Sequence, residues 1–137
     1  MAAALASSVS LASPEHPAFA AKTVAAARAA LGVTVAEPTV RVRVESPDIV
    51  DASSANGARV VVKVTSAIPG TDWIAIFVEP AAKPLVAFAD VAPGAKPVLA
   101  ATVPVKRTAA VRVVVRASGK YYQISREIKA ADKGCGE

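Results

Sequence analysis

Apolar and polar residues alternate along most of this chain after residue 32. Val40, Val42 and Val44 are separated by Arg41 and Arg43, so an extended strand places the valines on one face and the arginines on the other. The pattern predicts a strand with one buried face. Further strands are expected at residues 59–65, 98–105, 111–116 and 121–128.

Two other segments differ from this alternation. Residues 73–78 read Trp-Ile-Ala-Ile-Phe-Val, and so continuous an apolar run predicts a central strand covered on both faces. Residues 85–89 lie between prolines, which favours an edge strand. Turns are expected at Asn56-Gly57 and at 118–120, where glycine accepts positive φ. Seven strands joined by turns rich in Gly and Pro predict an all-β fold, an antiparallel β-sandwich of immunoglobulin-like type.

The segment before the first strand has helical spacing. Val24, Ala27 and Leu31 recur at intervals of three and four residues, and Gly32 supplies a stop signal. We therefore expect one short helix over residues 21–32.

Residues 1–20 are rich in alanine and end in Ala18-Phe19-Ala20, a small-x-small pattern typical of a signal cleavage site. The basic region of an export signal is missing. The segment is interpreted as the remnant of an export signal whose start lies further upstream; the alternative is an Ala-rich extension. The apolar run is too short to span a bilayer. His16, the only histidine, has no partner in this stretch and is interpreted as incidental.

The length, charge and aromatic content of the chain restrict the classes of function that are expected. The 137 residues suit one domain, and the net charge of +5 permits acidic partners. The cations recur at even spacings that indicate solvated strand faces, no basic run exists, and only six residues are aromatic. Nucleic-acid binding is therefore not expected.

The carboxy-terminal residues carry the candidate chemistry. Cys135, the single cysteine, lies between Gly134 and Gly136 two residues from the end, and these glycines give its backbone unusual freedom. If the last strand ends near Ile128, seven residues separate it from Cys135 and reach roughly 23 to 25 Å when extended. Residues 130–137 are thus predicted to be a flexible arm that presents a thiol to a partner's pocket.

The thiol has no activating group in its own chain. Thiolate is the reactive form; Lys133 favours it weakly, and the neighbouring carboxylates oppose it. The sequence has no second histidine as a base, no paired cysteines for a metal and no Gly-rich phosphate loop. We expect a carrier acted on by other enzymes, without metal or cofactor. The alternative is a structural or interaction subunit with an inert tail.

Several segments also carry a resemblance. Residues 73–79 and 83–88 look like the central strands, and 118–122 with 125–129 like the final hairpin, of one bacterial family. Residues 133–137, Lys-Gly-Cys-Gly-Glu, stand where that family ends in Gly-Gly-Cys-Gly-Gly. From about residue 27 to its end the chain resembles SoxY, the sulfur-carrying subunit of the thiosulfate-oxidising Sox system.

The resemblance implies a periplasmic carrier with an immunoglobulin-like SoxY domain over residues 33–129, paired with a SoxZ-like subunit. In that family the arm's cysteine, here Cys135, is oxidatively conjugated to thiosulfate by a haem-containing enzyme. A second enzyme releases sulfate, and the remaining cysteine persulfide is processed by sulfur-oxidising enzymes. Lys133 and Glu137 replace the outer glycines; Lys133 is placed to attract anionic thiosulfate.

Overall fold

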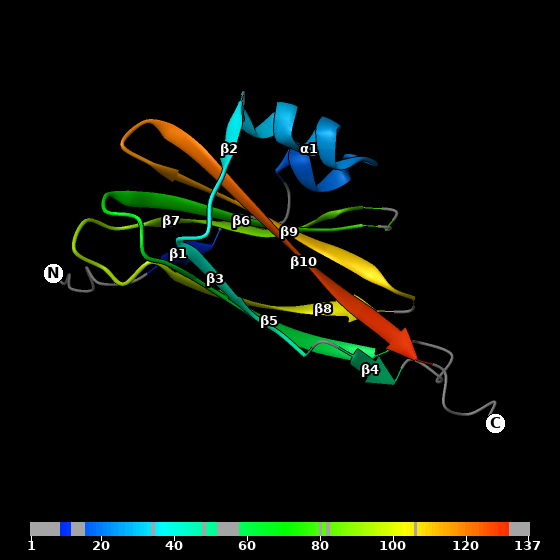
Figure 1. Ribbon diagram of the computed structural model, residues 1–137. Coiled ribbons are helices and arrows are strands. Elements are labelled where there is room, and N and C mark those ends of the chain that lie inside the picture. Colours follow the sequence, from blue (N-terminus) through cyan, green and yellow to red (C-terminus); the bar gives the residue numbers. More distant parts are fainter. Residues whose placement is uncertain are drawn as a thin grey trace, which may run out of the picture.

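The computed structural model describes residues 9–11, 16–33, 35–47, 49–51, 58–79, 81, 83–105 and 107–131 (Figure 1). Within these residues the chain forms ten strands, one α-helix and one 3-10 helix. In order they are β1 (Val9–Leu11), η2 (Pro17–Ala20), α1 (Val24–Leu31), β2 (Ala36–Pro38), β3 (Val42–Glu45), β4 (Ile49–Asp51), β5 (Ala58–Ser66), β6 (Thr71–Glu79), β7 (Leu85–Val91), β8 (Val98–Val105), β9 (Ala109–Ala117) and β10 (Lys120–Ala131).

The strands form two sheets that pack face to face. The larger sheet has the order β1-β7-β6-β9-β10-β2, with β4 also paired to β10, and the smaller has the order β3-β5-β8. Figure 1 shows the smaller sheet below the larger one and α1 above both. The fold is an immunoglobulin-like β-sandwich, as the strand pattern predicts.

The space between the sheets is filled mainly by valine. The fully buried residues include Val62, Val64 and Val103 from the smaller sheet and Val111 and Val115 from the larger. Because a β-branched side chain suits the pleated surface of a strand, the alternating valines supply most of this core; the described aromatic residue that packs against it is the partly buried Tyr122.

The seven predicted strands correspond to β3 and β5 to β10. β6 is buried from Trp73 to Val78, which confirms the expected central strand. The tight connection at Ser118-Gly119 is also confirmed, since both residues have positive φ. The turn expected at Asn56-Gly57 lies outside the described residues.

Three details of the predicted strands are wrong. Val40 lies outside β3 and is 93% exposed, so only Val42 and Val44 of the expected valine row are buried. β7 is no edge strand, because β1 pairs with its second half. The sandwich also contains two parallel pairings, of β10 with β2 and with β4, that alternation could not reveal.

The predicted helix is confirmed as α1. The Thr23 Oγ1 accepts a hydrogen bond from the Ala26 amide at 3.0 Å and caps its start, and Gly32 ends it with a φ of 80°. The helix buries Val24 and Ala27 against the outer face of the larger sheet.

Part of the segment interpreted as an export remnant packs on the same face. Ala18 of η2 is fully buried, and the Phe19 ring stacks on Phe88 of β7 with centroids 5.5 Å apart. His16, interpreted as incidental, has a structural role: its Nδ1 accepts a hydrogen bond from the Ala18 amide, and its ring meets Phe88 edge to face. η2 and α1 together form a third layer over the larger sheet.

Among the described residues, no helix has both the length and the apolar character that crossing a membrane requires.

Candidate functional site

The predicted carrier residues Lys133, Gly134, Cys135 and Gly136 lie outside the described residues. The last described residue is Ala131, at the end of β10. The point at which the chain leaves the sandwich is therefore the part of the candidate site that the structure defines. We call the end of β10, from Arg126 to Ala131, the arm root.

The last strand is longer than the sequence predicts. Beyond Ile128, residues 129–131 pair in parallel with β4, and the Ala130 amide donates a hydrogen bond to Thr108 Oγ1 at 3.1 Å. The predicted strand end near Ile128 is therefore corrected to Ala131. Four residues lead from Ala131 to Cys135, and four extended residues reach at most about 13 to 14 Å.

Side chains hold the arm root in the sandwich. Ile128 is fully buried in the core and pairs with Ala109 of β9. The Arg126 guanidinium donates hydrogen bonds to the carbonyl oxygens of Val44 and Ser46, at 3.3 and 3.2 Å. These bonds join β10 to the end of β3, in the opposite sheet, just before the chain forms β4. The arm root is thus tied to both sheets.

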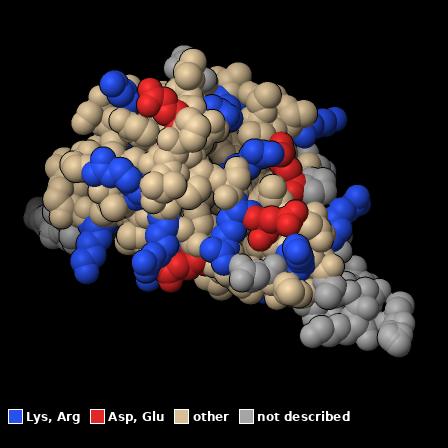
Figure 2. All heavy atoms as spheres, in the orientation of Figure 1, with Lys and Arg blue, Asp and Glu red and all other residues tan. Residues whose placement is uncertain are grey.

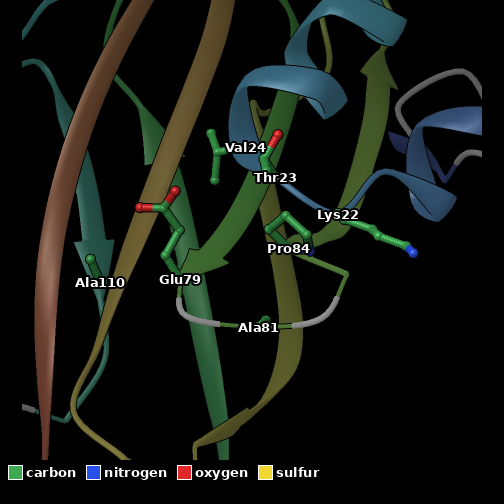
Figure 3. A pocket seen from close by; sticks show the side chains of 7 residues that line it. All are labelled: Lys22, Thr23, Val24, Glu79, Ala81, Pro84 and Ala110. Carbon is green, nitrogen blue, oxygen red and sulfur yellow. The ribbon is translucent and has the colours of Figure 1, made fainter.

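A hollow of about 500 Å³ opens at the same end of the larger sheet (Figure 3). Glu79 of β6 lies opposite Ala110 of β9, which in turn lies opposite Glu127 of β10, so the hollow and the arm root share one end of three adjacent strands. The lining residues are Lys22, Thr23, Val24, Glu79, Ala81, Pro84 and Ala110.

The hollow offers little reactive chemistry. The Glu79 carboxylate accepts a hydrogen bond from Arg112 Nε at 2.8 Å and is held in that ion pair. Thr23 caps α1, and Figure 3 shows the Lys22 amine directed away from the other lining side chains. The lining residues that the structure describes include neither histidine nor cysteine. No group of three or more potential metal ligands occurs in the described part of the chain.

A second ion pair lies on the same outer face of the larger sheet. Arg116 Nε donates to Asp72 at 2.9 Å, and this hydrogen bond raises the pKa of the Arg116 guanidinium above its usual value against a smaller effect of burial. Both arginines of β9 are therefore neutralised by acids of β6.

Sequence reasoning missed the elements that hold the arm root. Ile49 and its neighbours in β4 are too few to show a period, and Thr108 follows a Lys-Arg pair that reads as an ordinary turn. The sequence does contain a signal for Arg126, because this cation falls on the apolar side of β10 between Ile124 and Ile128. A cation on a buried face needs acceptors, and here backbone carbonyls supply them.

Known proteins resemble this chain in sequence and in structure. The family described as "Sulfur oxidation protein SoxY" matches residues 27–135. The sulfur carrier protein SoxY from Chlorobium limicola f thiosulfatophilum is 34% identical, with a TM-score of 0.70 over 80% of this chain and 96% of that one. No curated protein matches the chain.

A more distant similarity concerns the fold alone. A superoxide reductase (neelaredoxin) from Ignicoccus hospitalis gives a TM-score of 0.54 at 17% identity, over 66% of this chain and 80% of that one. The family match extends through the arm root and includes Cys135. With 109 residues matched from 27 to 135, and a one-third identical structure spanning most of the chain, this protein belongs to the SoxY family.

Proposed function

We propose that this chain is the sulfur carrier of a periplasmic thiosulfate-oxidising system and that Cys135 is the residue to which sulfur is attached. Membership of the SoxY family and the similarity to a sulfur carrier protein support the carrier role. The observation that bears most directly on Cys135 is the arm root, since the chain's only cysteine follows it by four residues.

The chemistry requires a thiolate and an external oxidant. The Cys135 thiolate and the terminal sulfur of thiosulfate form a sulfur–sulfur bond, and the two electrons released pass to a haem-containing partner. Hydrolysis of the product by a second enzyme consumes one water, releases sulfate and two protons, and leaves the cysteine persulfide as its anion. Sulfur-oxidising enzymes then remove the remaining sulfur.

The arrangement at the arm root suits a substrate that is passed between enzymes. Ile128 and Arg126 hold the end of β10, so each partner meets the arm at a defined place. Gly134 and Gly136 remove two side chains next to the thiol, which eases entry into a narrow site. Lys133 adds one positive charge beside the incoming thiosulfate anion, a small and salt-sensitive attraction.

In this proposal the chain is itself no enzyme and needs no resident cofactor. The bases, haem and metal ions belong to its partners, which include the SoxZ subunit that the family implies. The tether beyond Ala131 is short, about 13 to 14 Å at most. Each enzyme must therefore dock against the sandwich close to the arm root before its active site can receive Cys135.

The test is mass spectrometry after incubation with thiosulfate and the haem-containing enzyme. We expect one thiosulfate unit on Cys135, and none on the Cys135→Ser protein. A Lys133→Gly protein is the control for the arm itself, because it retains the thiol and should still be loaded. An unmodified Cys135 under conditions in which another SoxY protein is loaded would favour a subunit with an inert tail.

A further inference from the structure

The outer face of the smaller sheet is positively charged and uncovered in the described structure. On this face, which we call the basic face, the outward side chains of β3 and β5 and of the residue before β3 include the exposed cations Arg41, Arg43, Arg59 and Lys63. Val61 lies among them and is 62% exposed. Figure 2 shows blue side chains gathered where β3 and β5 lie, with α1 in the opposite part of the view.

The cations of this face have no acidic partners within the described part of the chain. The two ion pairs there, Arg112 with Glu79 and Arg116 with Asp72, both lie on the other sheet. On the basic face the carboxylate of Glu45 stands opposite Lys63 in the strand register, without an ion pair within 4 Å. Charges that are fully hydrated and unpaired lose little when an opposite charge approaches them.

One end of the basic face also has a hollow that fits a side chain. About 430 Å³ of space lies beside the start of β3, lined by Val40, Arg41, Arg43, Glu45, Thr65 and Ala67. Val40 is 93% exposed here. Two guanidinium groups next to an apolar residue suit a carboxylate on a protein surface, which offers the guanidinium two parallel acceptors.

The basic face is next to the arm root. β5 begins at Ala58, which pairs with Val105 at the end of β8, and the chain then turns to Thr108, whose hydroxyl accepts from Ala130. Arg59 is therefore at the arm-root end of the face, and Arg43 lies toward the other end. A protein docked on this face would have the short tether at its border.

The composition of the basic face favours a transient interaction with a protein partner. Nucleic acids need aromatic side chains for stacking or a continuous cationic track, and the described aromatic residues lie in the core or on the larger sheet. Permanent interfaces are mostly apolar with few charges at their centre. Four cations, one carboxylate and two exposed valines instead resemble a salt-sensitive surface that steers association.

We propose that the basic face is the docking surface for an acidic patch on the haem-containing enzyme that loads Cys135. The inference rests on the proposed function for the identity of its partner. The proposal names the binding surface and the interacting groups. Carboxylates of the enzyme pair with the cations of the basic face, which are Arg41, Arg43, Arg59 and Lys63. The larger sheet is not contacted.

The experiment compares two variants that change the net charge equally. In Arg43→Glu/Arg59→Glu the basic face is reversed at both ends, and Glu45 is not placed opposite a new carboxylate. In Lys83→Glu/Lys120→Glu the same charge change is made outside the basic face, at two exposed residues that lie just before β7 and at the start of β10. Circular dichroism confirms that both proteins are folded before they are used.

The first readout is steady-state loading by the purified haem-containing enzyme. We expect the KM for the carrier to rise about tenfold in Arg43→Glu/Arg59→Glu with kcat unchanged, and by less than twofold in the control. The KM of the unmodified carrier should also rise with salt, and that of the reversed protein should not. A KM within twofold of the parent, or an equal rise in both variants, would overturn the proposal.

The second readout separates docking from chemistry. Calorimetry with the Cys135→Ser protein measures binding to the same enzyme without any reaction, and the two reversals are repeated in that background. If the parent carrier is never loaded but docking still depends on the basic face, the proposed function fails and the docking surface stands. If the reversal abolishes binding of the SoxZ subunit and leaves the enzyme's binding unchanged, the face belongs to that interface and the proposal is wrong.

Discussion

Alternating arginines lie on both outer faces of the sandwich, but the acidic partners and the covering elements of the two faces differ. On the larger sheet, Arg112 and Arg116 of β9 are paired with Glu79 and Asp72 of β6, and α1 and η2 cover the apolar part of that face. On the smaller sheet, Arg43, Arg59 and Lys63 are exposed. The outer face of the larger sheet is partly covered by a third layer, and no such layer occurs over the smaller sheet in the described part of the chain.

Alternation of apolar and polar residues therefore indicates a solvated strand face but does not indicate the function of that face. Arg41 and Arg43 look like Arg112 and Arg116 in sequence, since each pair is separated by valine-rich strand positions. The neighbours across the sheet decide the outcome. β6 brings acids to β9, whereas β5 brings further cations to β3. Substitutions on either face test this difference.

The largest expected effect is on the covered face. Phe77 is fully buried beneath the third layer, so Phe77→Ala should lower the free energy of unfolding by about 3 to 5 kcal/mol. Val61→Ala on the open face should change it by less than about 0.5 kcal/mol. Urea denaturation followed by the fluorescence of Trp73 measures both. Similar losses in the two proteins would show that the open face is covered in solution.

A smaller effect is expected when the third layer is shortened. A chain that begins at Ala21 lacks β1 and η2, and with them the buried Ala18 and the Phe19 ring on Phe88. We expect it to lose about 2 kcal/mol of stability, since burial of one large apolar side chain contributes about 1.5 to 3 kcal/mol. Thermal unfolding and binding of a hydrophobic dye measure this loss.

Phe19→Ala in the full chain is the matched control, because it removes the ring and retains β1. Equal stability of the shortened and full chains would mean that residues 1–20 contribute nothing to the fold. That result would favour the interpretation of this segment as an export remnant.

The smallest expected effect is on the ion pairs. Arg112→Gln and Arg116→Gln should each lower the free energy of unfolding by less than about 1 kcal/mol, because the pairs are well exposed and solvent screens them. Arg43→Gln removes no partner and should cost nothing measurable. Denaturation at low and high salt tests the contrast. Losses of the same size at all three positions would contradict the unequal pairing of the two faces.

Much of the sandwich was predictable because its strands are regular. Trp73 to Val78 had to be central, since no solvated face exists in that run, and the structure buries all six residues. Thr23 and Gly32 mark the ends of a helix by local capping alone. The hairpin at Ser118-Gly119 follows from the need for positive φ. Each of these signals lies within a few residues of the feature that it predicts.

The failures concern contacts between distant segments. β1 and β4 have three residues each, too few for a period, and exist because β7 and β10 offer free backbone groups. Val40 alternates correctly with Val42, but β3 starts two residues later and leaves Val40 in solvent. The true end of β10 depends on Thr108 and on β4, both far away in the chain.

Seven of the ten described strands, the helix, the Ser118-Gly119 turn and the family could be predicted from the amino-acid sequence alone, because local periodicity, capping and motifs require no knowledge of distant neighbours. Which strands share a sheet, which arginines pair with acids and where the arm root ends became known from the three-dimensional structure. A two-residue period indicates that one side of a strand is buried, but it does not indicate which residues cover that side. Pairing, burial and charge neutralisation depend on partners that lie far along the chain.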